Sequence, residues 1–175
     1  MNFIKTAIEG VYIIEPRIFT DARGYFFESY SRAAFEAAGL HYDFVQDNQS
    51  KSCYGTVRGL HFQKGEHAQA KLVRVLEGTV LDVAVDIRRS SPTYGQHVAV
   101  ELSAENNRQL MIPRGFAHGF SVLSETAVFA YKCDNLYCKE SEGGIRFDDP
   151  TLAIDWRIDM AKAITSDKDK LHPFF

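Results

Sequence analysis

His61 is the residue of this chain best suited to proton transfer at neutral pH. It lies in the segment TVRGLHFQ (56–63), three residues after Arg58 and two before Gln63. Residues two apart on a strand share a face, so His61 and Gln63 can both point into a barrel. An imidazole titrates near neutral pH and accepts a proton without extreme tuning. A lone histidine is more often a satisfied core residue, but other reactive side chains accompany this one.

Three further side chains can complete a site for proton abstraction beside a carbonyl group. Such chemistry needs a base, a group that stabilises the enolate oxygen, and an acid that returns a proton. Lys71, just before an apolar strand, is a candidate for the second role, and Tyr131, in FAYKCD, for the third. Either Asp167 or Asp169 of the terminal SDKD can hydrogen-bond the far nitrogen of His61 and fix its tautomer. The simpler alternatives are a solvated lysine, a packed tyrosine and a charged tail in water.

A second histidine suggests a different chemistry, that of a metal-dependent enzyme. The segment IPRGFAHGF (112–120) has a Pro-x-Gly-x-x-His arrangement, which resembles the second signature of the cupin superfamily of small β-barrels. That pattern often supplies a metal ligand, and His61, His67 and His118 can meet in space as three-histidine sites do. The first cupin signature requires a His-x-His pair followed by Glu, which the chain does not contain. A metal site is therefore the second interpretation.

The composition excludes several classes of protein. Hydrophobic residues make up 45% of the chain and charged residues 25%, as in an ordinary globular protein. The net charge of −3 lacks the basic surface of a nucleic-acid-binding protein, so no nucleic-acid partner is expected. No apolar leader or membrane-length apolar stretch is present, which predicts a cytoplasmic protein without a membrane partner. Cys53, Cys133 and Cys138 form no CxxC pair and are expected to be reduced structural thiols.

Short strand-like runs separated by turn residues must position these side chains. Residues 72–89 (LVRVLEGTVLDVAVDIRR) contain two such runs broken at Glu77 and Gly78, a pattern that predicts a β-hairpin. Residues 31–40 (SRAAFEAAGL) predict a helix capped by Ser31 and ended by Gly39, and residues 159–163 a short helical turn. The pattern predicts one domain over residues 1–175, mainly β, as a sandwich or barrel. Further strand candidates are VYIIEPRIF, YFFESY, HVAVEL, NRQLMIP, AHGFSVLS and TAVFAYKCD.

Six ordered segments, spread over nearly the whole chain, are similar to one known family. Each segment alone is a weak signal, but the six in this order resemble the dTDP-4-dehydrorhamnose 3,5-epimerase family. The segments are EPRIFTDARGYFFESY (15–30), FVQDNQSKS (44–52), VRGLHFQ with KLVRVLEGTVLDVAVDIRRSSPTYG (71–95), IPRGFAHGF, YKCDNLYCKESEGGIRFDDPTLAIDW (131–156) and the terminal SDKD.

The resemblance implies a fold, a substrate and a mechanism. The implied fold is a cupin-type jelly-roll β-barrel with a few short peripheral helices, and the implied assembly is a homodimer without metal or cofactor. The implied substrate is dTDP-4-dehydro-6-deoxy-D-glucose, epimerised at C3 and C5 to dTDP-4-dehydro-L-rhamnose. By the same resemblance His61 is the base, Asp169 its orienting partner, Tyr131 the acid and Lys71 the group that stabilises the enolate at the C4 oxygen.

The resemblance also implies a set of substrate-binding residues. Tyr137 is expected to stack on the thymine ring. The residues expected to contact sugar or diphosphate are Arg23, Glu28, Gln46, Asn48, Arg58, His118, Glu142 and Lys168. Three alternatives stay open: an epimerase that acts at C3 or C5 only, a metal-dependent cupin enzyme, and a sugar-binding barrel without turnover.

Overall fold

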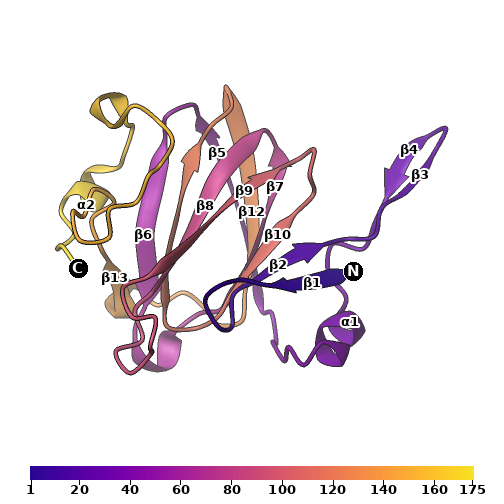
Figure 1. Ribbon diagram of the computed structural model, residues 1–175, viewed down its shortest axis with the longest axis horizontal. Coiled ribbons are helices and arrows are strands. Elements are labelled where there is room, and N and C mark those ends of the chain that lie inside the picture. The colour runs from indigo at the N-terminus through magenta and orange to yellow at the C-terminus, as the bar shows by residue number, and fades with distance from the viewer.

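The computed structural model describes residues 1–175 and consists mainly of two antiparallel β-sheets packed face to face (Figure 1). The six-stranded sheet has the order β1 (Asn2–Lys5), β2 (Tyr12–Glu15), β10 (Gln109–Ile112), β7 (Lys71–Glu77), β12 (Thr126–Cys133) and β5 (Gln46–Cys53). The five-stranded sheet has the order β13 (Glu142–Gly144), β6 (Val57–Gln63), β11 (Phe116–Val122), β8 (Thr79–Asp86) and β9 (His97–Ser103). The prediction of a mainly β sandwich is confirmed.

The remaining elements are short and lie around the sandwich. A separate hairpin of β3 (Phe19–Asp21) and β4 (Gly24–Phe26) projects away from both sheets (Figure 1). The helices are α1 (Arg32–Ala37), η1 (Gly65–His67), η2 (Lys139–Ser141), η3 (Met160–Lys162) and α2 (Asp167–Lys170). None of them has the length and apolar character that crossing a membrane requires.

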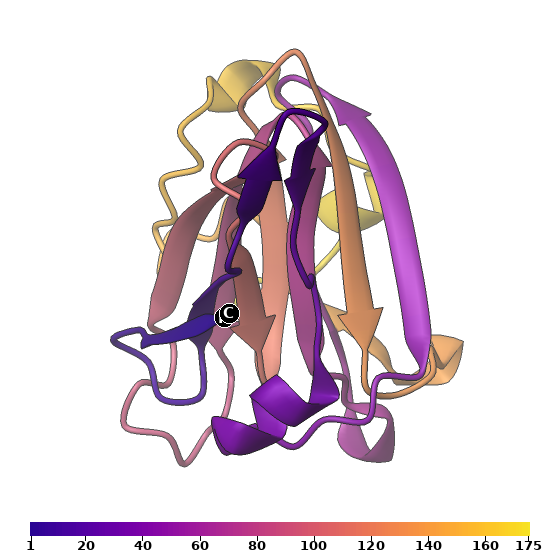
Figure 2. The same cartoon turned by 90° about the vertical axis from the view of Figure 1, so that its right-hand side faces the viewer.

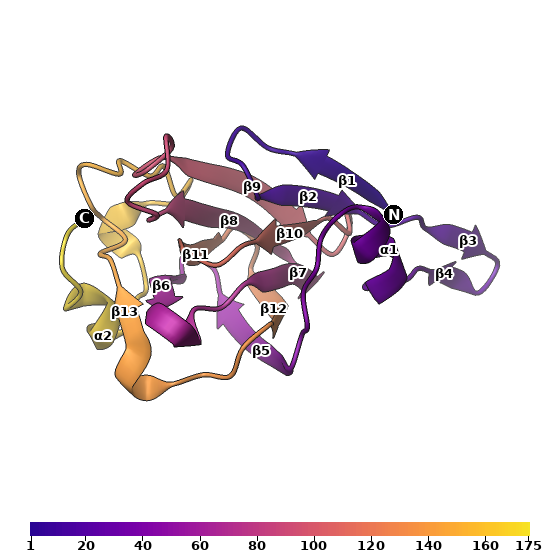
Figure 3. The same cartoon turned by 90° about the horizontal axis from the view of Figure 1, so that it is seen from below.

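Apolar side chains fill both the space between the sheets and the outer face of the five-stranded sheet. Phe120, Phe129 and thirteen other residues form the cluster between the sheets. A second cluster of 10 residues, which includes Trp156, covers the outer face. Because both faces are covered, β8 and β11 are almost wholly buried. The covering chain is the C-terminal segment, which lies along this face in two views (Figures 1 and 3). This segment brings the terminal acids toward β6.

The predicted hairpin at residues 72–89 is wrong. Strands β7 and β8 do form, but β7 pairs with β10 and β12 while β8 pairs with β9 and β11, in the other sheet. The connection at Gly78 therefore turns a corner from one sheet to the other. Figure 2 shows the whole sandwich turned by 90° from the view of Figure 1. A two-residue break between apolar runs is typical of both a hairpin and such a corner. What decides between them is that β8 is buried on both faces.

Both helical predictions are confirmed. The hydroxyl of Ser31 accepts a hydrogen bond from the Ala34 N–H at the start of α1, and Gly39 follows its end with a φ of +77°. The predicted turn at 159–163 is η3, where the Asp159 side chain accepts from the Ala161 N–H.

Replacement of Gly78 tests the corner. Gly78 has a φ of +78°, and an added Cβ would overlap the Thr126 carbonyl oxygen and the Ser124 hydroxyl. We expect Gly78→Ala to lower the free energy of unfolding by about 3 kcal/mol, because it combines left-handed backbone strain with a backbone clash. Gly39→Ala is the matched control, since its φ is also positive but its surroundings are open, and it should cost about 1 kcal/mol. Urea denaturation measures both, and equal losses would contradict the packed corner.

Candidate active site

One carboxylate joins the end of the chain to β6. Oδ1 of Asp169 lies 2.7 Å from Nε2 of His61, and Oδ2 accepts the N–H of Gly59 at 3.3 Å. The Asp169 side chain is 4% exposed, whereas that of Asp167 is 99% exposed. The charged tail therefore folds back onto the sheet, and of its two acids Asp169 is the one that meets His61. Since the carboxylate accepts, Nε2 carries the proton and the lone pair is on Nδ1.

A β-bulge in β6 determines which residues flank His61. His61 pairs with His118 of β11, and Arg58 pairs with Phe120, so three steps on β6 oppose two on β11. The extra residue brings Arg58 and His61 onto the same face although they are three apart, a spacing that predicts opposite faces in a regular strand. It also leaves the Gly59 N–H free of the ladder, and Asp169 accepts it.

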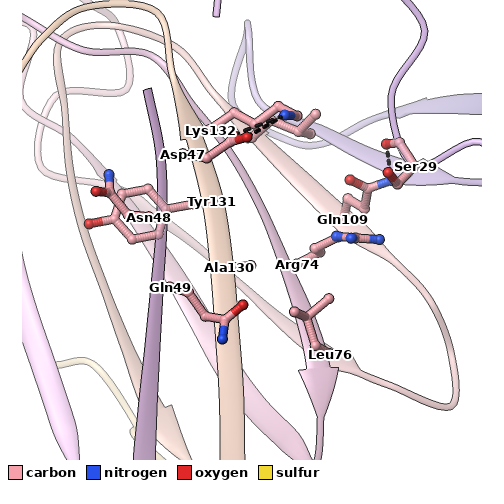
Figure 4. A pocket seen from close by; sticks show the side chains of 11 residues that line it. Ser29, Asp47, Asn48, Gln49, Arg74, Leu76, Gln109, Ala130, Tyr131 and Lys132 are labelled. Atoms are coloured by element: carbon pink, nitrogen blue, oxygen red, sulfur yellow. Dashed lines mark hydrogen bonds and ion pairs between the residues drawn. The ribbon is translucent and has the colours of Figure 1, made fainter. Parts of the chain in front are cut away.

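His61 and Tyr131 line a common cavity of about 290 Å³ between the two sheets. His61 comes from the five-stranded sheet and Tyr131 from β12 of the other. Lys71, at the start of β7, places its ammonium 5.7 Å from the centre of the Tyr131 ring. The lining residues are Asn48, Gln49, Ser50, Arg58, His61, Lys71, His118, Phe120, Phe129 and Tyr131. Tyr131 and Asn48 extend to one side of their strands, and Arg74, Leu76 and Gln109 border a groove on the other side (Figure 4).

Burial shifts the titration of three groups in or beside this cavity. Burial raises the pKa of the Tyr131 phenol, and the charge of the nearby Cys133 raises it further. Tyr131 is therefore a neutral hydrogen-bond donor at neutral pH. Burial lowers the pKa of the Lys71 ammonium, although Cys133 and Asp82 act in the opposite direction. Burial of Asp169 favours its neutral form, but the hydrogen bond and charge of His61 outweigh this, and the pKa of the carboxyl is lowered. Asp169 is therefore ionised at neutral pH.

A second histidine and carboxylate meet deeper in the barrel. Nε2 of His118 lies 2.9 Å from Oδ2 of Asp82, whose side chain is fully buried. The ring of His118 stacks on Phe129 at a centroid distance of 5.9 Å. Sequence analysis did not single out Asp82. Its signal is a charged residue within the otherwise apolar run TVLDVAV, because a carboxylate is almost never fully buried without a partner.

Five of the predicted binding residues form a connected group near the cavity. The Tyr137 hydroxyl donates to Glu142 at 3.0 Å, and Lys168 forms an ion pair with the same carboxylate. The hydrogen bond from Lys168 lowers the pKa of Glu142. The Tyr137 N–H donates to Oε1 of Gln46 at 3.2 Å, and the Gln46 amide donates to Asn48 at 3.0 Å. Since Asn48 lines the cavity, this group continues the polar lining outward.

The remaining predicted residues do not reach the cavity of this chain. Arg23 lies on the exposed hairpin and pairs with Asp21, and Glu28 is exposed on the segment that follows the hairpin. The three histidines of the metal interpretation do not come together either. Nδ1 of His67 is bound to the Ser141 hydroxyl at 2.9 Å, and His67 does not line the cavity that holds His61 and His118.

Comparison with known proteins identifies the family. The family model described as dTDP-4-dehydrorhamnose 3,5-epimerase matches residues 5–175. The dTDP-4-dehydrorhamnose 3,5-epimerase of Salmonella typhimurium is 55% identical over 174 residues, which cover 99% of this chain and 94% of the relative. The chain belongs to the dTDP-4-dehydrorhamnose 3,5-epimerase family.

Solved structures of epimerases agree with this assignment. The dTDP-4-dehydrorhamnose 3,5-epimerase of Elizabethkingia anophelis has a TM-score of 0.96 at 59% identity, over 100% of this chain and 96% of that chain. The dTDP-6-deoxy-D-glucose-3,5-epimerase of Legionella pneumophila, in complex with dTDP-4-keto-L-rhamnose, has a TM-score of 0.95 at 52% identity, over 99% of this chain and 92% of that chain. The family, fold and isomerase class inferred from the sequence are confirmed.

The thiols of this epimerase-family chain provide a test of the burial of Cys133, which lies two residues after Tyr131 in β12. All three cysteines are free, Cys53 is exposed, and burial raises the pKa of Cys133 to about 11. Because the thiolate is the reactive form, only about one Cys133 thiol in a thousand is ionised at pH 8. We expect iodoacetamide to label Cys133 at least about 100-fold more slowly than Cys53, as followed by peptide mass spectrometry. Labelling in urea is the control and should reach both, whereas equal rates in the folded protein would contradict a buried thiol.

Proposed function

We propose that the chain converts dTDP-4-dehydro-6-deoxy-D-glucose to dTDP-4-dehydro-L-rhamnose, with His61 as base and Tyr131 as acid. One observation carries the proposal: a carboxylate-bound imidazole, a neutral phenol and an ammonium line the same cavity between the sheets. These are the three groups that inversion beside a ketone requires.

In the proposed reaction His61 removes a proton from a carbon next to the C4 ketone. The proton goes to Nδ1, since Nε2 already donates to Asp169, and the resulting imidazolium is stabilised by the ionised carboxylate. The electron pair moves onto the C4 oxygen, where the charge of Lys71 stabilises the enolate more strongly than it would in water. Tyr131 then gives its phenolic proton to the other side of the same carbon. The electron pair returns to that carbon and the C4 ketone forms again. His61 then gives its extra proton to water and Tyr131 takes one back from water, so the same step can be applied in turn at C3 and C5 and inverts both centres.

The binding roles are proposed on the same basis. Arg58 and His118 line the cavity itself, and His118 is held by its buried partner Asp82. The connected group of Gln46, Asn48, Tyr137, Glu142 and Lys168 is proposed to bind the rest of the nucleotide sugar, with Tyr137 stacking on thymine. Arg58 and Lys168 supply positive charge for a diphosphate, which pairs well with such cations.

Solvent exchange tests the reaction. Incubated with dTDP-4-dehydro-6-deoxy-D-glucose in D₂O, the protein should incorporate deuterium at C3 and C5, as measured by NMR. His61→Asn removes the base and should slow exchange at both carbons by about 10³-fold.

His67→Ala is the matched histidine control and should keep the wild-type rate, because His67 is bound to Ser141 and does not line the cavity. Deuterium at only one of the two carbons would show that the protein is a mono-epimerase. Near-normal exchange by His61→Asn would refute the mechanism.

We propose further that the active protein is a homodimer in which each hairpin completes the partner's site. Arg23 and Glu28 are the two expected binding residues that lie away from their own chain's cavity. The hairpin also exposes large aromatic side chains, with Phe19, Tyr25 and Phe26 each more than half exposed at 51%, 65% and 67%. An exposed apolar group of this kind indicates a partner surface.

We also propose a cytoplasmic location, because the free cysteines suit the reducing cytoplasm.

Subunit mixing tests this arrangement. The variants Arg23→Ala and His61→Asn should each be weakly active alone, since every site of either homodimer lacks one group. In a refolded equal mixture about half of the dimers are hybrids, and each hybrid has one intact site, so about a quarter of wild-type activity should return. A mixture no more active than its components would show that both residues serve a site within one chain.

A further inference from the structure

His172 is a second imidazole beside the His61 and Asp169 pair, and the proposed mechanism does not use it. Its ring meets that of His61 edge-on, with centroids 5.7 Å apart and planes at 75°. Its Nε2 lies 3.8 Å from Oδ1 of Asp169, and its side chain is only 13% exposed. Nε2 is buried and has no hydrogen-bond partner. An unpaired buried nitrogen costs free energy, so the fold holds this ring in place against a penalty.

The chain fixes His172 from both sides. Ser166 caps α2, the helix that precedes it. After it, the Pro173 carbonyl oxygen accepts the Arg146 N–H at 2.9 Å, and the Phe175 N–H donates to Asp149 at 2.6 Å. The terminal segment is therefore anchored to the sandwich, and this anchoring holds the backbone that carries the ring.

Gly144 makes room for the ring. It belongs to β13 and pairs directly with His61 in β6. Its backbone is outside the left-handed region, so glycine is not needed there for conformational reasons. A Cβ at this position would instead overlap the imidazole of His172. The ring thus occupies a space that the strand next to His61 leaves open.

The charged groups around His172 come from three elements. His61 faces it from β6, Glu142 from the start of β13, and Asp169 and Lys168 from α2. Burial, followed by the charge of His61, lowers the pKa of His172, although Asp169 and Glu142 act in the opposite direction. The ring is therefore neutral at neutral pH.

We propose that His172 is a positioning residue, which supports the His61 and Asp169 pair when neutral and competes for Asp169 when protonated. At 3.8 Å the neutral ring is too far for a hydrogen bond, so Asp169 serves His61 alone while the ring fills the space beside both. A protonated ring has to move only about 1 Å to form a charged hydrogen bond with the carboxylate. Asp169 is then shared, and His61 loses the partner that orients it. The inference deepens the proposed function and rests on it.

The pH dependence of kcat/KM for exchange in D₂O tests this role. Two protonations, at His61 and His172, should inactivate the wild type. On the acid side of the profile its kcat/KM should therefore fall by up to about 100-fold per pH unit. His172→Leu fills the space without titrating, and its acid limb should fall only about 10-fold per unit. At pH 8 it should keep kcat within about 2-fold, whereas His172→Ala, which empties the space, should lower kcat about 10-fold with little change in KM. His97→Leu is the control, since His97 is half-buried with a lowered pKa but lies in β9.

The outcomes separate this inference from the proposed function. A wild type without any exchange would refute the proposed function. A wild type that exchanges normally, but whose acid limb has the same slope as that of His172→Leu, would refute the role of His172 alone. NMR of the imidazole nitrogens in the unmodified protein gives a second readout that does not depend on a variant folding. The ring of His172 should titrate in step with a shift of the His61 nitrogens, and an independent titration would overturn the proposal.

Discussion

The Asp169 carboxylate is the interaction on which the site depends, because it connects two parts of the chain, α2 and β6, that are far apart in sequence. It ties the C-terminal helix to β6 through His61 and to the bulge through the Gly59 N–H. A buried carboxylate without partners is costly, and these two donors, with the Ser166 cap that fixes α2, satisfy it. The same C-terminal segment covers the outer face of the five-stranded sheet. Packing of the Trp156 cluster therefore delivers the carboxylate to the imidazole, and stability and chemistry depend on the same stretch of chain.

Burial acts on Tyr131, Lys71 and Asp169, and in each case it favours the neutral form. The outcome differs with the neighbours. Tyr131 has no strong counter-charge, so its phenol keeps its proton and can donate it. Asp169 is paired with His61 and stays ionised. Lys71 lies between these cases, since burial lowers its pKa while Cys133 and Asp82 support its charge. One low-dielectric space thus prepares a proton donor, a carboxylate and an electrophile with different properties.

The sequence predicts the chemistry of this site better than its geometry. Periodicity and capping patterns predicted most of the strands, the helix α1 and the turn η3, but not β1, β5, β13 or α2. Residue types selected His61, Lys71 and Tyr131 because few side chains can do proton transfer near neutral pH. The corner at Gly78 was mistaken for a hairpin, since local pattern does not record which sheet a strand joins. The shared face of Arg58 and His61 depends on an inserted residue, and the choice of Asp169 over Asp167 depends on a tertiary fold-back. Asp82 carried a signal, a charge within an apolar strand.

The two-sheet architecture itself suits an inversion. A base and an acid that act on opposite sides of one ring have to face each other across it, and residues on a single strand cannot do so. Packed sheets lie about 10 Å apart, which is enough for a sugar ring between side chains from both. His61 projects from one sheet and Tyr131 from the other into the same cavity. The sandwich therefore sets the separation and the opposition of the two groups, and the bulge and the Asp169 carboxylate are left to set only the orientation of the base.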